Sequence, residues 1–150
     1  MEVAVSDAFF GFDHADVRVV SLSAVENFYD ALMPELGLPV KAFGFVDAEG
    51  DWHEPSDAHP YNTVEYHEAL VPGEPERFVA FTEDPGMRPT GTRLAFRVAS
   101  AAEVVRWRAR LVELGAQRIE VGDDFEEYPA VFFSDPAGTL LEICARRPKS

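Results

Sequence analysis

Ser23-Ala24-Val25-Glu26 and Ser100-Ala101-Ala102-Glu103 are two similar stretches that predict the starts of two matching helices. In each stretch the serine and the glutamate have the spacing of a capping box, in which the serine oxygen accepts a hydrogen bond from a first-turn amide. Both helical runs then end in Glu-Leu-Gly, at residues 35–37 and 113–115, where glycine permits a left-handed exit. Such a repeat predicts two copies of one supersecondary module, with equivalent positions converging on a cleft.

A short apolar strand precedes each helix and three β-prone segments follow it, so each copy is predicted to be a βαβββ module. The expected strands are 12–20, 40–46, 63–70 and 77–81 in module 1 (about 12–83), and 92–99, 118–121, 130–133 and 140–145 in module 2 (about 92–146). A chain of 150 residues is too short for two ordinary cores, so one domain spanning 1–150 is expected. The fold class is α/β (α+β): a curved mixed sheet around a central cleft, with the helices outside.

Charge and hydropathy exclude several partners. A net charge of −14 repels phosphate backbones, so no nucleic acid partner is expected. No apolar run is long enough to cross a bilayer, and residues 1–12 lack the basic segment of a secretion signal. Together with the single cysteine, Cys144, these features predict a cytoplasmic protein with no membrane partner.

Alternation along the strands sorts charged side chains onto the face turned away from the helices. Charges are seldom placed on a concave inner surface for stability alone. This face is therefore the candidate site, and its polar set is His14, Asp16, Arg18, Arg93, Arg97, Glu142 and Cys144.

Phe12-Asp13-His14, the paired modules, and Asp135-Pro136-Ala137-Gly138 leading into Leu141-Glu142-Ile143 resemble the vicinal oxygen chelate superfamily. This superfamily includes glyoxalases, bleomycin resistance proteins and extradiol dioxygenases, and the resemblance covers about residues 12–145. It implies a half-barrel around a small-molecule site and a homodimer. In enzymatic members it also implies a divalent metal such as Zn, Fe, Mn or Ni, held on inward residues of the first and last strand of each module.

Carried over to this chain, the resemblance makes His14 and Glu142 metal ligands. Arg93 stands where the second module usually offers a histidine, and Ala80 where an acid or histidine is usual; neither binds a cation. His67 is a third candidate ligand. Two interpretations remain: a metal-dependent lyase, isomerase or dioxygenase, or a protein without metal in which Arg93 replaces the cation and pairs with Glu142 at roughly 2.7–3.2 Å.

In both interpretations, arginines on the inner face favour an anionic small-molecule ligand. The ligand-binding candidates are Arg18, Arg93, Arg97 and Tyr128, and the catalytic candidates, if the protein is an enzyme, are Glu142, Arg93 and Tyr128. Tyr128 either offers its phenol to the ligand or packs on Phe132 or Phe133. The sequence leaves open whether the two modules pair within one chain or between two chains.

Overall fold

The computed structural model describes residues 2–3 and 11–147. Within these residues the chain forms two helices and nine strands, in an α+β arrangement of two modules. In order they are β1 (His14–Val19), α1 (Leu22–Glu35), β2 (Val40–Val46), β3 (Trp52–His53), β4 (Thr63–His67), β5 (Phe78–Glu83), β6 (Arg93–Arg97), α2 (Ala101–Leu114), β7 (Gln117–Val121), β8 (Ala130–Ser134) and β9 (Leu140–Cys144).

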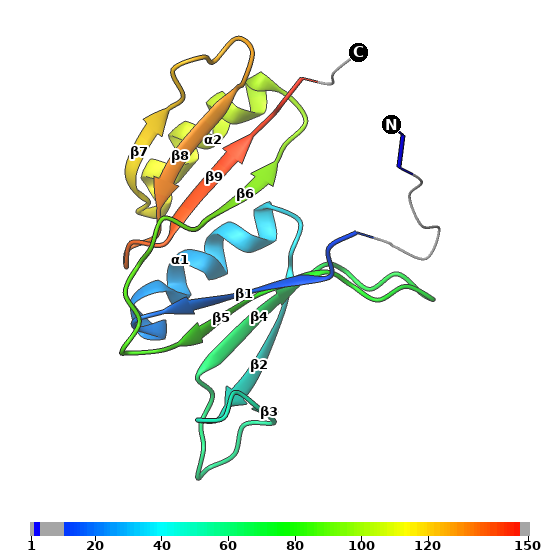
Figure 1. The fold of residues 1–150 in the computed structure, drawn as a ribbon, viewed down its shortest axis with the longest axis vertical. Helices are drawn as coiled ribbons and strands as arrows, with labels where there is room; N and C mark the ends of the chain where they lie inside the picture. Colours follow the sequence, from blue (N-terminus) through cyan, green and yellow to red (C-terminus); the bar gives the residue numbers. More distant parts are fainter. Residues whose placement is uncertain (1, 4–10, 148–150) are drawn as a thin grey trace.

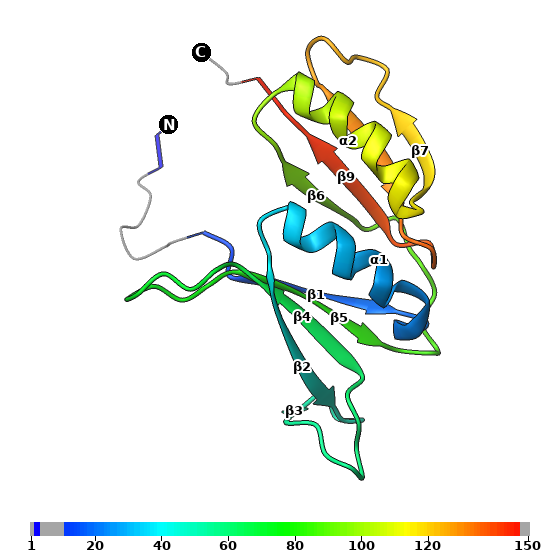
Figure 2. The same cartoon turned by 180° about the vertical axis from the view of Figure 1, so that it is seen from behind.

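The strands form one mixed sheet in each module (Figure 1). Module 1 has a curled five-stranded sheet in the order β1-β5-β4-β2-β3, and module 2 has a four-stranded sheet in the order β6-β9-β8-β7. In each, the first strand pairs in parallel with the last strand of its module, and the other pairs are antiparallel. Figure 2 shows both helices on the same side of the molecule, in front of the strands. The predicted two-module fold is confirmed.

Each helix buries one apolar face. In α1, Val25, Tyr29 and Leu32 are fully buried, and in α2, Trp107 and Leu111 are buried to the same degree. These side chains join one apolar core that continues from module 1 into module 2. Because the helices cover one face of each sheet, the opposite faces stay available for a ligand.

The local hydrogen bonding explains where the predicted strands differ from those observed. The strand predicted at 63–70 ends at His67, since from Glu68 onward the chain forms a narrow hairpin in which the Glu68 amide bonds to the Arg77 carbonyl. The two-residue strand β3 lies between β2 and β4, where no strand was predicted. None of the helices in the described residues is both long and apolar enough to cross a membrane.

The two helix starts differ, although their sequences match. Ser100 caps α2 as predicted: its hydroxyl accepts a hydrogen bond from the Glu103 amide at 3.2 Å. The predicted cap at Ser23 is wrong, because α1 already begins at Leu22. The Leu22 amide instead donates to a carboxylate oxygen of Glu83 at 2.9 Å. A residue at the end of β5, distant in sequence, therefore supplies the acceptor that Ser23 was expected to provide.

Ser100→Ala should lower the free energy of unfolding by about 1 kcal/mol, because it removes a side-chain acceptor from a helix start. Ser23→Ala should change it by less than about 0.5 kcal/mol, since Ser23 caps nothing. Urea unfolding followed by circular dichroism measures both. Equal losses in the two variants would show that Ser23 does cap α1.

A buried hydrogen bond joins the two modules. The Tyr29 hydroxyl on α1 donates to Asp135 Oδ2 at 2.6 Å, and both residues are 0% exposed. The other oxygen, Asp135 Oδ1, accepts from the amides of Ala137 and Thr139 at 2.8 and 3.0 Å. Asp135 thus holds its own turn in shape and binds the helix of the other module.

Candidate functional site

The concave face of module 1 carries three rows of side chains that the strand register places side by side. His14, Phe78 and His67 form the first row. Asp16, Ala80 and Glu65 form the second, and Arg18, Thr82 and Thr63 form the third. His14, Asp16 and Arg18 are exposed, while Val19 on the opposite face is buried. The face predicted from alternation is therefore the observed one.

A hollow of about 240 Å³ lies on this face, and residues from all three rows line it. Trp52 on β3 forms part of its wall, and its indole lies directly over Gly44, where any side chain would collide with it. Trp52 was not predicted as a site residue, because it lies between the expected strands 40–46 and 63–70. The one available signal was Gly44 in the middle of a β-prone run, a position that often marks a close approach.

Two carboxylates flank the His14 ring. Its Nδ1 lies 2.7 Å from Asp13 Oδ2, and its Nε2 lies 3.5 Å from Asp16 Oδ2. The hydrogen bond with Asp13 raises the pKa of His14 above 6.5. An imidazolium donates from both nitrogens and has no lone pair for a metal. The two carboxylates thus favour the protonated form of His14.

Asp13→Asn should lower the pKa of His14 more than Asp16→Asn does, because Asp13 makes the shorter hydrogen bond. A histidine whose pKa is raised by folding stabilises the fold fully below its unfolded pKa of about 6.5. That contribution is lost as the pH rises through the folded-state pKa. Titration of the His14 ring by NMR measures the shift, and a native pKa below 6.5 would contradict the arrangement.

The structure does not bring His67 to His14. The Phe78 ring lies between the two imidazoles, 4.4 Å from each and stacked on both. His67 Nε2 contacts Glu65 Oε1 at 2.8 Å instead. His67 is therefore separated from the other predicted ligands by an apolar ring.

The register makes the two modules equivalent position by position. His14 opposes Phe78 as Arg93 opposes Leu140, and both are the first residues of their strands. By the same register, Arg18 corresponds to Arg97, and Ala80 to Glu142. The register agrees with the predicted correspondence of His14 with Arg93, and the module 1 counterpart of Glu142 is an alanine, which has no donor atom.

Glu142 is bound by Tyr128 rather than by Arg93. The Tyr128 hydroxyl donates to Glu142 Oε2 at 2.6 Å, and this bond raises the pKa of Tyr128, so the phenol stays protonated. The Arg93 guanidinium lies over the Phe132 ring, 4.8 Å from its centroid. The predicted Arg93–Glu142 ion pair is absent from the hydrogen bonds and ion pairs of the described residues. Arg93 contacts the Phe132 ring instead, and Glu142 accepts its hydrogen bond from Tyr128.

Three further candidate residues of the concave faces are Cys144, Arg18 and Arg97. Burial raises the pKa of the Cys144 thiol, which is therefore no activated nucleophile. Within residues 11–147, Arg18 and Arg97 have no carboxylate partner. Arg18 also lines a hollow of about 200 Å³ beside the linker between the modules. Both arginines thus carry charge that no described carboxylate neutralises.

The donor set does not fit the metal that the resemblance implies. His14 lies between the carboxylates of Asp13 and Asp16, Arg93 occupies the place of a second ligand, and Glu142 Oε2 accepts a hydrogen bond from Tyr128. Across the described parts of the chain, no three His, Cys, Asp or Glu side chains are grouped to hold a metal ion. The geometry instead presents cations, hydrogen-bond donors and an aromatic wall.

Sequence comparison finds no matching family model and no matching curated protein. Structure comparison does find relatives of this fold. A glyoxalase/bleomycin resistance protein from Albidiferax ferrireducens T118 superposes with a TM-score of 0.57 at 21% identity, over 91% of this chain and 98% of its own. A glyoxylase/bleomycin resistance protein/dioxygenase domain from Frankia sp. EAN1pec gives 0.58 at 20% identity, over 95% and 96%.

The fosfomycin resistance protein FosX from Listeria monocytogenes, in complex with Mn(II) and a sulfate ion, gives a TM-score of 0.57 at 17% identity. The match covers 93% of this chain and 92% of FosX. These proteins are members of the vicinal oxygen chelate superfamily, so the fold expected from the sequence is confirmed.

Proposed function

We propose that this protein, which has the vicinal oxygen chelate fold, binds a small anionic molecule on its concave sheets without a resident metal. One observation carries the proposal: equivalent positions of the two modules hold basic side chains. His14 corresponds to Arg93, and Arg18 corresponds to Arg97. Asp13 and Asp16 flank His14, whereas Arg18 and Arg97 have no carboxylate partner among the described residues, so these two arginines are open to an anion. Arginine also matches carboxylate, phosphate and sulfate oxygens in geometry.

The proposed site is completed by a second copy of the chain. No hydrogen bonds join the five-stranded to the four-stranded sheet in the described residues, so each protomer presents two separate half-sites. In a homodimer, the module 1 face of one protomer would oppose the module 2 face of its partner. We place this dimer in the cytoplasm, where Cys144 would stay reduced.

Tyr128 and Glu142 would provide the polar contacts beside the cations. The phenol is a neutral donor, and the carboxylate, 6% exposed, accepts its hydrogen bond. In a reaction, Arg93 would polarise the substrate, and Glu142 and Tyr128 would exchange a proton with it. The competing interpretation is a divalent-metal-dependent lyase, isomerase or dioxygenase that uses His14 and Glu142 as ligands; the Mn(II) bound by FosX supports it.

Elemental analysis of the purified protein, combined with titration by sulfate and by MnCl₂, separates the two interpretations. Trp52 lines the module 1 hollow and serves as the fluorescent reporter. The proposal expects substoichiometric metal, a saturable response to sulfate, and no need for Mn²⁺. One equivalent of tightly held metal, or a sulfate response only in the presence of Mn²⁺, would contradict it and support the metal-dependent interpretation.

A further inference from the structure

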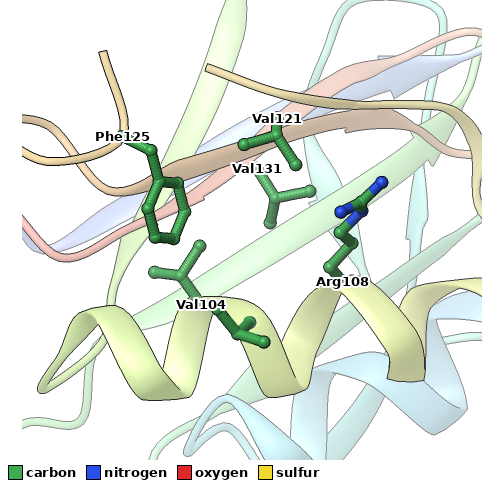
Figure 3. Close-up of a pocket in the computed structure, with 6 residues that line it drawn as sticks. Val104, Arg108, Val121, Phe125 and Val131 are labelled. Atoms are coloured by element: carbon green, nitrogen blue, oxygen red, sulfur yellow. The ribbon is translucent and has the colours of Figure 1, made fainter. Parts of the chain in front are cut away.

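Another hollow lies on the helix side of module 2, away from the concave face (Figure 3). It encloses about 180 Å³ between α2, β7, β8 and the loop that joins these strands. Its lining residues are Val104, Val105, Arg108, Val121, Phe125 and Val131. Val131 belongs to the alternate set of β8 that faces α2, whereas its neighbour Phe132 lies beside Glu142 on the concave face. The hollow is therefore separate from the candidate site.

The hollow is lined mainly by apolar side chains, and its base is well packed. Val104 and Val131 are buried to 1% and 0% exposure, so the base is part of the core. Phe125 closes one side, and its loop is tied by hydrogen bonds from the Tyr128 amide to the Asp124 carbonyl and from the Gly122 amide to the Ala130 carbonyl. The volume holds roughly six water molecules, which suits one aromatic ring or a short branched chain.

Arg108 adds a cation to this apolar hollow. It stands one helical turn after Val104, so both side chains lie on the same face of α2, and Figure 3 shows Arg108 beside Val121 and Val131. Its neighbours on the helix are neutralised: Arg106 pairs with Glu103, and Arg110 pairs with Glu35 and Glu113. Arg108 forms no ion pair with any described residue, although the chain has 27 acidic and only 13 basic residues.

We propose that this hollow binds a monocarboxylate with a compact apolar body, such as an aryl carboxylate. The apolar body would cover the valines and Phe125, and the carboxylate would accept hydrogen bonds from the Arg108 guanidinium. The acidic residues of the 122–129 loop are exposed and do not line the hollow. The inference does not depend on the proposed function, because no residue of the concave face takes part.

Benzoate is the probe, and amide NMR spectra of the full chain give the readout. Benzoate should shift the signals of Val104, Val121, Phe125 and Val131 with a dissociation constant on the order of 1 mM. Benzamide, the neutral analogue, should bind at least tenfold more weakly, since it lacks the charge that Arg108 recognises. Arg108→Gln should lose affinity for benzoate to the same extent.

Arg106→Gln is the matched control, because it removes an exposed arginine of the same helix that already pairs with Glu103. It should leave benzoate binding unchanged. Equal losses in the two variants, equal binding of benzamide, or shifts confined to the concave face would overturn the proposal. Dilution of the protein without benzoate is a further check: concentration-dependent shifts of the same valines would show that a second protein chain covers the hollow.

Discussion

Tyr29→Phe is expected to lower the free energy of unfolding by about 2–3 kcal/mol, because it leaves a buried carboxylate oxygen of Asp135 without its donor. Tyr29 packs on Phe81 with ring centroids 3.7 Å apart, so phenylalanine preserves the stacking and removes only the hydroxyl. For a chain of this length, the melting temperature should fall by about 4–12 °C. Urea unfolding and thermal melting followed by circular dichroism measure the two quantities.

Tyr61→Phe is the control for this result. Its hydroxyl also donates to a carboxylate, that of Glu26 at 3.0 Å, but Tyr61 is 42% exposed. Water replaces the lost partner at an exposed site, so the change should stay within about 0.5 kcal/mol. A similar loss in both variants would mean that the burial of Asp135, and the connection between the modules, adds nothing to stability.

Charge reversal at the concave face should have the largest effect on ligand binding. Arg18→Glu and Arg93→Glu should each weaken sulfate binding by about a hundredfold, since each removes a charge-assisted hydrogen bond and adds a repulsive carboxylate. Trp52 fluorescence measures the affinity. Arg106→Glu, on the outer helix α2, is the control and should leave sulfate binding intact.

The two reversals also test the proposed dimer. A heterodimer that carries Arg18→Glu in one protomer and Arg93→Glu in the other would have one site with both changes and one site with neither. It should therefore bind one sulfate per dimer with native affinity. If the heterodimer binds no better than either mutant homodimer, the two arginines act within the same protomer and the shared site is wrong.

The sequence predicted the parts of this molecule that depend on local pattern. The alternation that exposes His14 and Arg93 and the Ser100 cap both follow from neighbouring residues within one element. The Ser23 prediction was wrong because its competitor, Glu83, is distant along the chain. A pattern of neighbouring residues cannot predict a hydrogen-bond partner that is distant in sequence.

The candidate site shows the same division. The correspondence of His14 with Arg93 was implied by the family resemblance, and the strand register agrees with it. The partners of Glu142 and Arg93 were not predictable, because Tyr128 and Phe132 approach them through tertiary packing. Similarly, Phe78 separates His14 from His67 only because β5 runs between β1 and β4.

The unequal helix starts also bear on the order of folding. Ser100 acts three residues away, whereas the Leu22 amide must wait for Glu83, 61 residues further along the chain. Closing a loop of that length costs entropy before the contact forms. We therefore expect the first turn of α2 to gain protection from hydrogen exchange before that of α1 during refolding. The starts of α1 and α2, which are similar in sequence, would then form at different stages of folding.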